Sequence, residues 1–189
     1  MKKKIRMLSS NRYKLKEVQD FLKDYDIEIV GNEVKLEELQ TENLESLVKD
    51  KALKAYRKVG RPLIVEHTGL FLEKINGLPG GLTQIFWDKL GVKNFAKIFG
   101  APDDSSKAVA KTVLCYVDGK KINIFNGEIK GYITNSPRGE SSFQWDCIFI
   151  PEDFDKTFAE MEIKEKNKIS MRGKALDEFV KFINDIELK

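Results

Sequence analysis

The segment LIVEHTGL at residues 63–70 decides the fold, because a short apolar run passes there directly into polar residues. Leu63–Val65 is an apolar run with the β-branched content of a buried strand. Before it, apolar residues recur at helical spacing between Leu44 and Ala55, and Gly60-Arg61-Pro62 separates this predicted helix from the strand. The segment is therefore predicted to be a strand that follows a helix and ends in a polar cluster.

The same order of strand and helix precedes this segment. A short strand is predicted at residues 4–8, a helix from about Tyr13 to Tyr25, and a second strand at Ile27–Val30. Alternation of strands and helices favours an α/β fold built in layers. Because neither a linker nor an internal repeat is visible, the chain is predicted to form a single domain over residues 1–189.

The second half of the chain is predicted to extend the sheet. Two long strands joined by a hairpin turn at Asp118-Gly119 give the clearest signal. Gly77–Gly81 is predicted as a rigid turn that is neither helix nor strand. The other expected elements are a helix over residues 85–99, strands over Ala108–Val117, Ile122–Ile133 and Phe143–Ile150, and a final helix over Ala175–Ile183.

The composition excludes several classes of protein. Hydrophobic residues make up 41% of the chain, which is ample for a buried core and excludes a disordered protein. The net charge of +3 argues against a protein that coats nucleic acid, but leaves room for a local basic pocket that binds a small anion. One histidine and two cysteines argue against a zinc site. No membrane span or signal peptide is predicted, and the lone cysteines favour the cytoplasm.

Two polar clusters in the first half of the chain could bind phosphate and metal. Ser9–Lys14 is a strand-to-helix turn, where backbone N–H groups attract phosphate; ordinary helix capping by Asn11 is the alternative. Glu66 follows a buried strand and could bind Mg²⁺, with Glu38 as a second carboxylate; for Glu38 the alternative is a solvated charged loop.

Two more clusters in the second half could bind a base and further phosphate. In Phe143–Asp146, aromatic rings could stack on a base while Asp146 accepts hydrogen bonds from it; the alternative is the buried face of a strand. The cations of Lys166–Arg172 suit a polyphosphate, although a basic loop before a surface helix would look the same.

In order and spacing, these clusters resemble the motifs of the inosine triphosphate pyrophosphatase family, also called Ham1-like. Ser9–Lys14 resembles that family's T/S-x-N-x-x-K phosphate turn, and Glu66–Leu70 resembles its E-D-S/T-G-L motif. Further matches along the chain are Gly77–Gly80 (G-L-P-G), Pro137–Gly139 (P-R-G), Phe143–Phe149 (F-G-W/Y-D-P-x-F), Thr157–Met161 (T-x-A-E-M), Lys166-Asn167 (K-N) and Ser170–Leu176 (S-H-R-x-x-A-L).

The resemblance implies a fold, an activity and a set of roles. The fold would be a curved central mixed sheet flanked by helices, with two lobes around a nucleotide-binding cleft, in a homodimer. The activity would be Mg²⁺-dependent hydrolysis of ITP, dITP and XTP to the monophosphate and pyrophosphate. By resemblance, the triphosphate would be held by Ser9, Asn11, Lys14 and Lys166, the metal by Glu38 and Glu66, the hypoxanthine by Phe143, Trp145 and Asp146, and its 6-oxo group by Arg172.

Two residues depart from the motifs at positions that carry chemistry. His67 stands where the family has its catalytic aspartate, and Met171 where it has a base-contacting histidine. Imidazole can accept a proton but is a poorer ligand for Mg²⁺ than a carboxylate, and a thioether donates no hydrogen bond. Gln144 for Gly and Cys147 for Pro are milder changes in the base-binding segment.

These departures lead to two functional hypotheses. The first is a nucleotide sensor that binds dITP, ITP or XTP with weak or lost hydrolysis and acts with a partner effector, for example in phage defence. The second is an active pyrophosphohydrolase in which His67 serves as the base. A protein that binds no nucleotide is disfavoured, because the polar residues of the motifs would then have no purpose. No residue in the clusters is identified as a reader of the ribose 2′-hydroxyl.

Overall fold

The fold is built on one mixed sheet. The computed structural model describes residues 2–32, 34–101, 106–140 and 143–187, and its sheet has the strand order β2-β1-β3-β5-β6-β7, with β4 paired to β3. The strand β1 is parallel to β2 and to β3, and the remaining pairs are antiparallel. The strands span β1 Lys3–Leu8, β2 Ile27–Asn32, β3 Leu63–Leu72, β4 Pro79–Gly80, β5 Lys107–Val117, β6 Ile122–Ile133 and β7 Phe149–Pro151.

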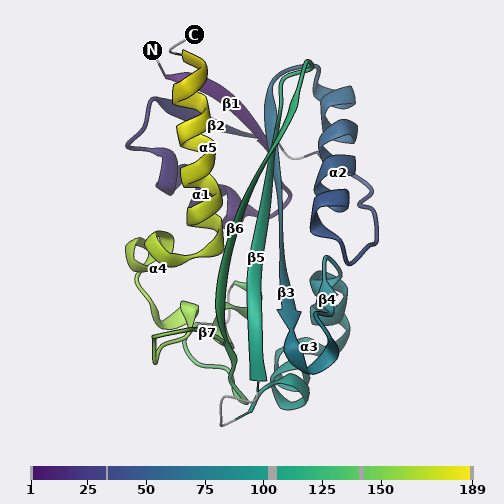
Figure 1. The fold of residues 1–189 in the computed structure, drawn as a ribbon, viewed down its shortest axis with the longest axis vertical. Coiled ribbons are helices and arrows are strands. Elements are labelled where there is room, and N and C mark those ends of the chain that lie inside the picture. Colours follow the sequence, from purple (N-terminus) through teal and green to yellow (C-terminus); the bar gives the residue numbers. More distant parts are fainter. Residues whose placement is uncertain (1, 33, 102–105, 141–142, 188–189) are drawn as a thin grey trace.

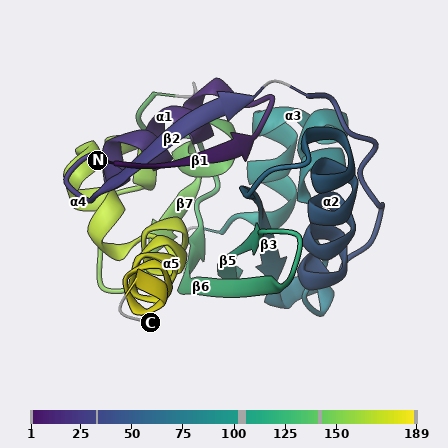
Figure 2. The ribbon, with the colours of Figure 1, turned by 90° about the horizontal axis from the view of Figure 1, so that it is seen from above.

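Helices cover both faces of this sheet, which confirms the predicted α/β class (Figures 1 and 2). Apolar side chains of α1 and α5 pack on one face, and those of α2 pack on the opposite face. The helix bounds are α1 Arg12–Leu22, α2 Leu44–Val59, α3 Thr83–Phe99, α4 Ile163–Ile169 and α5 Met171–Glu187, with short 3₁₀ turns at η1 Glu73–Ile75, η3 Gln144–Cys147 and η4 Phe158–Glu160. None of the helices in the described part of the chain combines the length and the apolar composition that a membrane crossing needs.

The long strands β3, β5 and β6 run along most of the molecule (Figure 1). On the face of α1 and α5, they contribute to two of the three hydrophobic clusters that the described residues form. At one end, Ile64 and Leu114 belong to the core under α1 and α5. At the other end, Leu70 and Ala110 belong to a second core with α3 and β7. Between them, β3 carries the buried polar residues Glu66, His67 and Thr68. The sheet is therefore divided into two apolar lobes by a polar band.

The polar band lies where the edge of β3 changes partner. The strand β1 pairs with β3 at Leu63 and Ile64, and β4 pairs with β3 at Leu70 and Phe71. Because side chains alternate along a strand, Glu66 faces the side of α1 and α5, and His67 faces the side of α2. The gap between the two partners thus gives both side chains access to one cleft.

Gly69 explains why the motifs at residues 66–70 and 77–80 meet. A Cβ atom at Gly69 would lie 2.3 Å from the carbonyl oxygen of Gly80, so only glycine permits this approach. Thr83 Oγ1 then donates to the Gly80 carbonyl (2.6 Å) and accepts from the Leu70 N–H (2.8 Å). The predicted rigid turn at residues 77–81 therefore contains a two-residue strand, β4, and the expectation that it forms no strand was wrong.

Two other predicted elements need correction. Phe143–Ile150 is not one extended strand: a 3₁₀ turn, η3, forms first because Asp146 N–H bonds to the Phe143 carbonyl (3.1 Å), and β7 follows. The final helix begins at Met171 rather than Ala175, because Ser170 Oγ accepts from the Gly173 N–H (3.1 Å) and stabilises an earlier first turn. The preceding basic segment forms α4 rather than a loop.

Candidate functional site

A cavity of about 690 Å³, here called the large cavity, opens where β1 ends beside β3. It brings together six residues predicted from separate motifs. They come from the turn before α1, the segment before α2, and β3: Ser9, Asn11, Lys14, Glu38, Glu66 and His67.

The turn before α1 forms a helix cap at the wall of the large cavity. Asn11 Oδ1 accepts hydrogen bonds from the N–H groups of Tyr13 (3.0 Å) and Lys14 (3.1 Å), and Ser9 Oγ accepts from the Asn11 N–H (3.2 Å). The capping alternative is therefore confirmed, and it is compatible with a lining role because the same residues face the cavity. Since these N–H groups already have partners, the positive charge here comes from the side chains of Arg12 and Lys14 in the first turn of α1, which both line the cavity.

Glu66 is held by cations from two helices. Its carboxylate lies 2.8 Å from Lys14 Nζ of α1 and 3.2 Å from Arg172 Nε of α5, and it accepts from Thr68 Oγ1 at 3.2 Å. Burial favours the neutral acid, but Lys14 and Arg172 outweigh that effect and hold the pKa of Glu66 well below its usual range. Glu66, predicted as a metal ligand, is thus an ionised member of a buried network at pH 7.

Glu17 extends this network and was missed by the sequence predictions. It forms ion pairs with Arg172 Nη1 and, at 3.1 Å, with Lys166 Nζ. Lys166 in turn donates to Asp146 Oδ2 at 2.5 Å. Glu17 lies one helical turn after Lys14, on the same face of α1, and that spacing was the available signal.

A second cavity of about 350 Å³, here called the small cavity, adjoins the large one and shares Tyr13 with it. Its lining includes Phe143, Asp146 and Lys166, and Lys166 Nζ lies 4.5 Å from the centroid of the Phe143 ring. Burial raises the pKa of Asp146 to about 6; the ion pair with Lys166 opposes this shift, and the charge of Glu17 adds to it. Lys166, predicted to bind the triphosphate with Lys14, lies in this small cavity instead.

His67 lies on the other side of the large cavity, near Glu38. Its Nδ1 atom is 3.6 Å from Glu38 Oε2, and Glu38 is paired at 2.5 Å with Lys51, a residue of α2 that the sequence predictions did not include. Burial and the positive charges of Lys14 and Lys51 lower the pKa of His67 to about 4. The imidazole is therefore neutral at pH 7 and can accept a proton or a hydrogen bond.

These side chains alone do not fit a magnesium site. Magnesium needs several oxygen ligands at once, yet Glu66 is already bound by Lys14 and Arg172, and Glu38 by Lys51. Among the described residues, no group of three or more His, Cys, Asp and Glu side chains is placed to hold a metal ion.

Three predicted base contacts lie in the protein interior. Trp145 is buried, and its ring packs 5.6 Å from that of Phe149. Met171 is buried in the core beside α3, and Arg172 is 1% exposed and bound to carboxylates. The residues that line the two cavities do not include these three, so their contact with a base stays a prediction.

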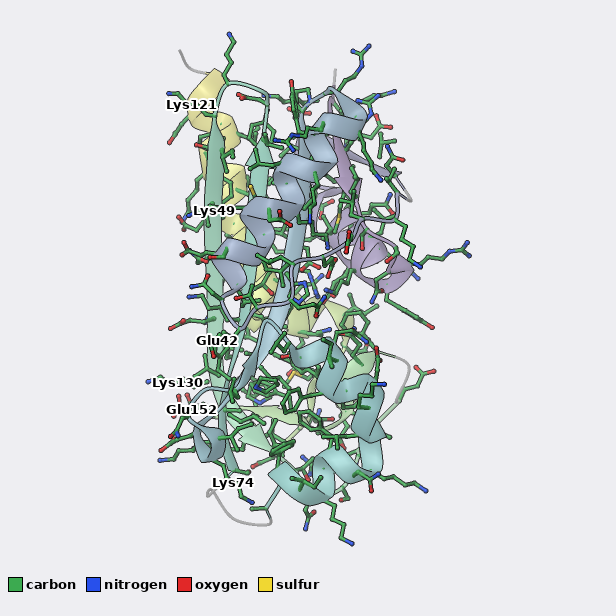
Figure 3. The ribbon with its side chains drawn as sticks, turned by 90° about the vertical axis from the view of Figure 1, so that its right-hand side faces the viewer. Glu42, Lys49, Lys74, Lys121, Lys130 and Glu152 are labelled. Atoms are coloured by element: carbon green, nitrogen blue, oxygen red, sulfur yellow. The ribbon has the colours of Figure 1, made fainter. Side chains whose placement is uncertain are left out.

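Part of the expected basic pocket is balanced by carboxylates. Lys14, Lys166 and Arg172 each pair with a carboxylate, but the lining of the large cavity still has four cationic side chains, Arg12, Lys14, Lys35 and Lys51, against Glu38 and Glu66. Many of the remaining lysines are exposed; Lys74 and Lys130, for example, lie on the outer surface of the molecule (Figure 3). The net charge of +3 thus does not come from one pocket alone.

Comparisons with known proteins show the family to which the chain belongs. The sequence profile of the Ham1 family matches residues 5–182. A dITP/XTP pyrophosphatase of Pyrococcus horikoshii is 38% identical over 180 residues, covering 95% of this chain and 96% of that protein. A second one, of Thermococcus kodakarensis, is 34% identical over 182 residues, covering 96% and 98%.

Solved structures show the same fold. A HAM1 protein from Coxiella burnetii superposes with a TM-score of 0.80 at 26% identity, covering 98% of this chain and 100% of that one. A dITP/XTP pyrophosphatase from Mycobacterium abscessus gives a TM-score of 0.70 at 26% identity, covering 94% and 98%. With a profile that matches nearly the whole chain and relatives above 30% identity, the chain belongs to the Ham1 family.

Proposed function

We propose that this protein hydrolyses ITP, dITP or XTP to the nucleoside monophosphate and pyrophosphate. The observation that carries the proposal is a neutral imidazole, His67, in a cavity that also presents Lys14 and Lys51. The names of the Pyrococcus and Thermococcus relatives, which are dITP/XTP pyrophosphatases, support the same substrate class. The purine would occupy the small cavity and the triphosphate the large one.

The small cavity suits a purine with a 6-oxo group. Such a purine carries a hydrogen on N1, whereas N1 of adenine is an acceptor. Asp146, ionised for the most part at pH 7, would accept this hydrogen, and Phe143 would stack on the ring. An adenine base would instead place the acceptor N1 against the buried carboxylate, which is a strong basis for discrimination.

The large cavity suits a triphosphate. Lys14 and Lys51 reach it from α1 and α2, and each is paired with a carboxylate while no anion is present. Phosphate oxygens would compete with these carboxylates for the same ammonium groups. Glu66 and Glu38 would then share these cations with the phosphates, and the added negative charge would need a cation that enters with the triphosphate.

His67 would supply the base for hydrolysis. Its neutral imidazole would take one proton from a water molecule while the water oxygen bonds to phosphorus. The bond between the α-phosphorus and the bridging oxygen breaks, and pyrophosphate leaves with the electron pair. Glu38, 3.6 Å from Nδ1, would stabilise the imidazolium that forms.

The experiment mixes the purified protein with dITP and Mg²⁺ and measures bound nucleotide and released pyrophosphate, with ATP as the control substrate. Catalytic release of pyrophosphate from dITP but not from ATP is expected. By the resemblance, His67 would stand in place of an aspartate of the family motif, so the sensor hypothesis remains the alternative, and tight binding without release would favour it. Absence of binding would contradict both.

Two other predictions from the resemblance stay predictions. Mg²⁺ accompanies nucleoside triphosphates in solution, so a requirement for it is measured by titrating the metal at fixed dITP. A homodimer is tested by the mass of the protein in solution. A partner effector and a role in phage defence have no support from the site or from the relatives.

A further inference from the structure

Gln144 lies at the junction of the two cavities. Its neighbour Phe143 lines the small cavity, while Gln144 itself lines the large one. Tyr13 lines both cavities, and its ring meets that of Phe143 edge-on at 6.0 Å. A nucleotide with its base in the small cavity and its phosphates in the large one must pass its sugar through this junction.

The backbone at Gln144 favours glycine. Gln144 has a φ of 45°, the left-handed conformation that costs a side-chain-bearing residue about 1 kcal/mol or more. Gly at this position would relieve that cost. A glutamine side chain is therefore present where the backbone conformation favours glycine. The contacts of its amide group are the next question.

Hydrogen bonds fix the orientation of this amide. The Asp88 carboxylate can only accept, so Gln84 Nε2 donates to Asp88 Oδ1 (2.7 Å). The oxygen Oε1 of Gln84 is then free to accept, and Gln144 Nε2 donates to it. This chain of hydrogen bonds, here called the relay, runs from Asp88 through Gln84 to Gln144. It occupies the Nε2 group of Gln144, so the side-chain oxygen Oε1 can accept a hydrogen bond from a ligand.

We propose that Gln144 Oε1 accepts a hydrogen bond from a hydroxyl of the nucleotide sugar, and that Gln84 and Asp88 are positioning residues for it. The inference rests on the proposed function, because it needs the base and the phosphates in the two cavities. It assigns this chain a residue that reads the sugar, in addition to the residues that bind base and phosphate.

The test measures the affinity of three reaction products by isothermal titration: IMP, 2′-deoxy-IMP and 2′,3′-dideoxy-IMP. Monophosphates are not hydrolysed to pyrophosphate, so turnover does not disturb the measurement. Gln144→Gly is expected to weaken IMP about fivefold, the value of one neutral hydrogen bond, and to leave dideoxy-IMP unchanged. If 2′-deoxy-IMP behaves as IMP does, the 3′-hydroxyl is the donor; if it behaves as dideoxy-IMP does, the donor is the 2′-hydroxyl.

Positioning is tested on α3. Asp88→Ala releases the relay and is expected to weaken IMP about twofold without affecting dideoxy-IMP. Lys89→Ala, an exposed neighbour on the same helix, is the matched control and should change neither. Thermal unfolding confirms that each variant is folded, and Gln144→Gly should unfold no earlier than the parent protein because glycine suits its φ.

The outcomes separate this inference from the proposed function. Equal weakening of IMP and dideoxy-IMP by Gln144→Gly, or unchanged affinity for IMP, would overturn the sugar contact while leaving the function intact. Failure of the parent protein to bind dITP would overturn the proposed function, and the sugar contact with it.

Discussion

Each of the two cavities holds a buried carboxylate that pairs with a lysine, but the pKa values of these two carboxylates shift in opposite directions. Glu66 in the large cavity and Asp146 in the small one are both buried, and both pair with a lysine. Glu66 faces a second cation, Arg172, and its pKa falls. Asp146 has one close cation, which Glu17 shares, and burial raises its pKa to about 6.

The difference shows that the number of close cations decides whether the pKa of a buried carboxylate falls or rises. Glu66 favours the folded state above the pKa it has when unfolded, and this contribution is lost as the pH falls through its lowered pKa. Asp146 has the opposite sign: its folded pKa lies above the unfolded value, so its contribution improves as the pH falls from 7 toward 4. The large cavity is thus built around fixed charge, and the small one around a carboxylate that titrates.

Replacing Arg172 is expected to have the largest effect on this comparison. Arg172→Met would leave Glu66 and Glu17 buried without their shared cation, and we expect the free energy of unfolding to fall by about 3–5 kcal/mol. Urea unfolding at pH 7 measures it. Arg172→Lys, which keeps a charge, should cost less, and a loss below about 1 kcal/mol in Arg172→Met would show that the network is not what stabilises the cleft.

The titration of Asp146 is the next test. Affinity for the nucleoside inosine, which has no phosphate to titrate in this range, should decrease as the pH falls from 7.5 to 5, with a midpoint near the pKa of about 6, because the protonated carboxyl no longer accepts the N1 hydrogen as an anion. Asp146→Asn is expected to weaken inosine about 30-fold at pH 7.5 and to remove the pH dependence. A pH profile shared by parent and variant would assign the titration to another group.

Lys51 tests whether the cavities act separately. Lys51→Met should weaken ITP about tenfold by removing one charge-assisted hydrogen bond to phosphate, while the affinity for the nucleoside inosine is unchanged. Competition binding with ITP and inosine measures both. The control is Lys54→Met on the same helix, because Lys54 pairs with Asp50. A matching loss for inosine would mean that Lys51 shapes the small cavity as well.

The sequence predicted the strands and helices of the molecule better than the buried ion pairs between them. Leu63–Val65 and the polar residues after it do form one strand, since apolar runs and glycine positions are local signals. Glu17 and Lys51 were missed because single charged residues on helices look solvated until packing shows what faces them. Trp145 was expected in the cleft, but a 3₁₀ turn directs it into the core, and local alternation carries no signal for such a turn.

The most direct test of the account is the rate of pyrophosphate release from dITP by the parent protein and by His67→Gln between pH 6 and 8. Because the pKa of His67 is about 4, its imidazole stays unprotonated between pH 6 and 8. The rate of the parent protein should therefore not fall through protonation of the base in this range. His67→Gln keeps a polar side chain without a base and should be slower by about 100-fold or more at every pH, while dITP still binds. Equal rates in the two proteins, or binding of dITP without release by the parent, would contradict the proposal that His67 is the base of an active pyrophosphohydrolase.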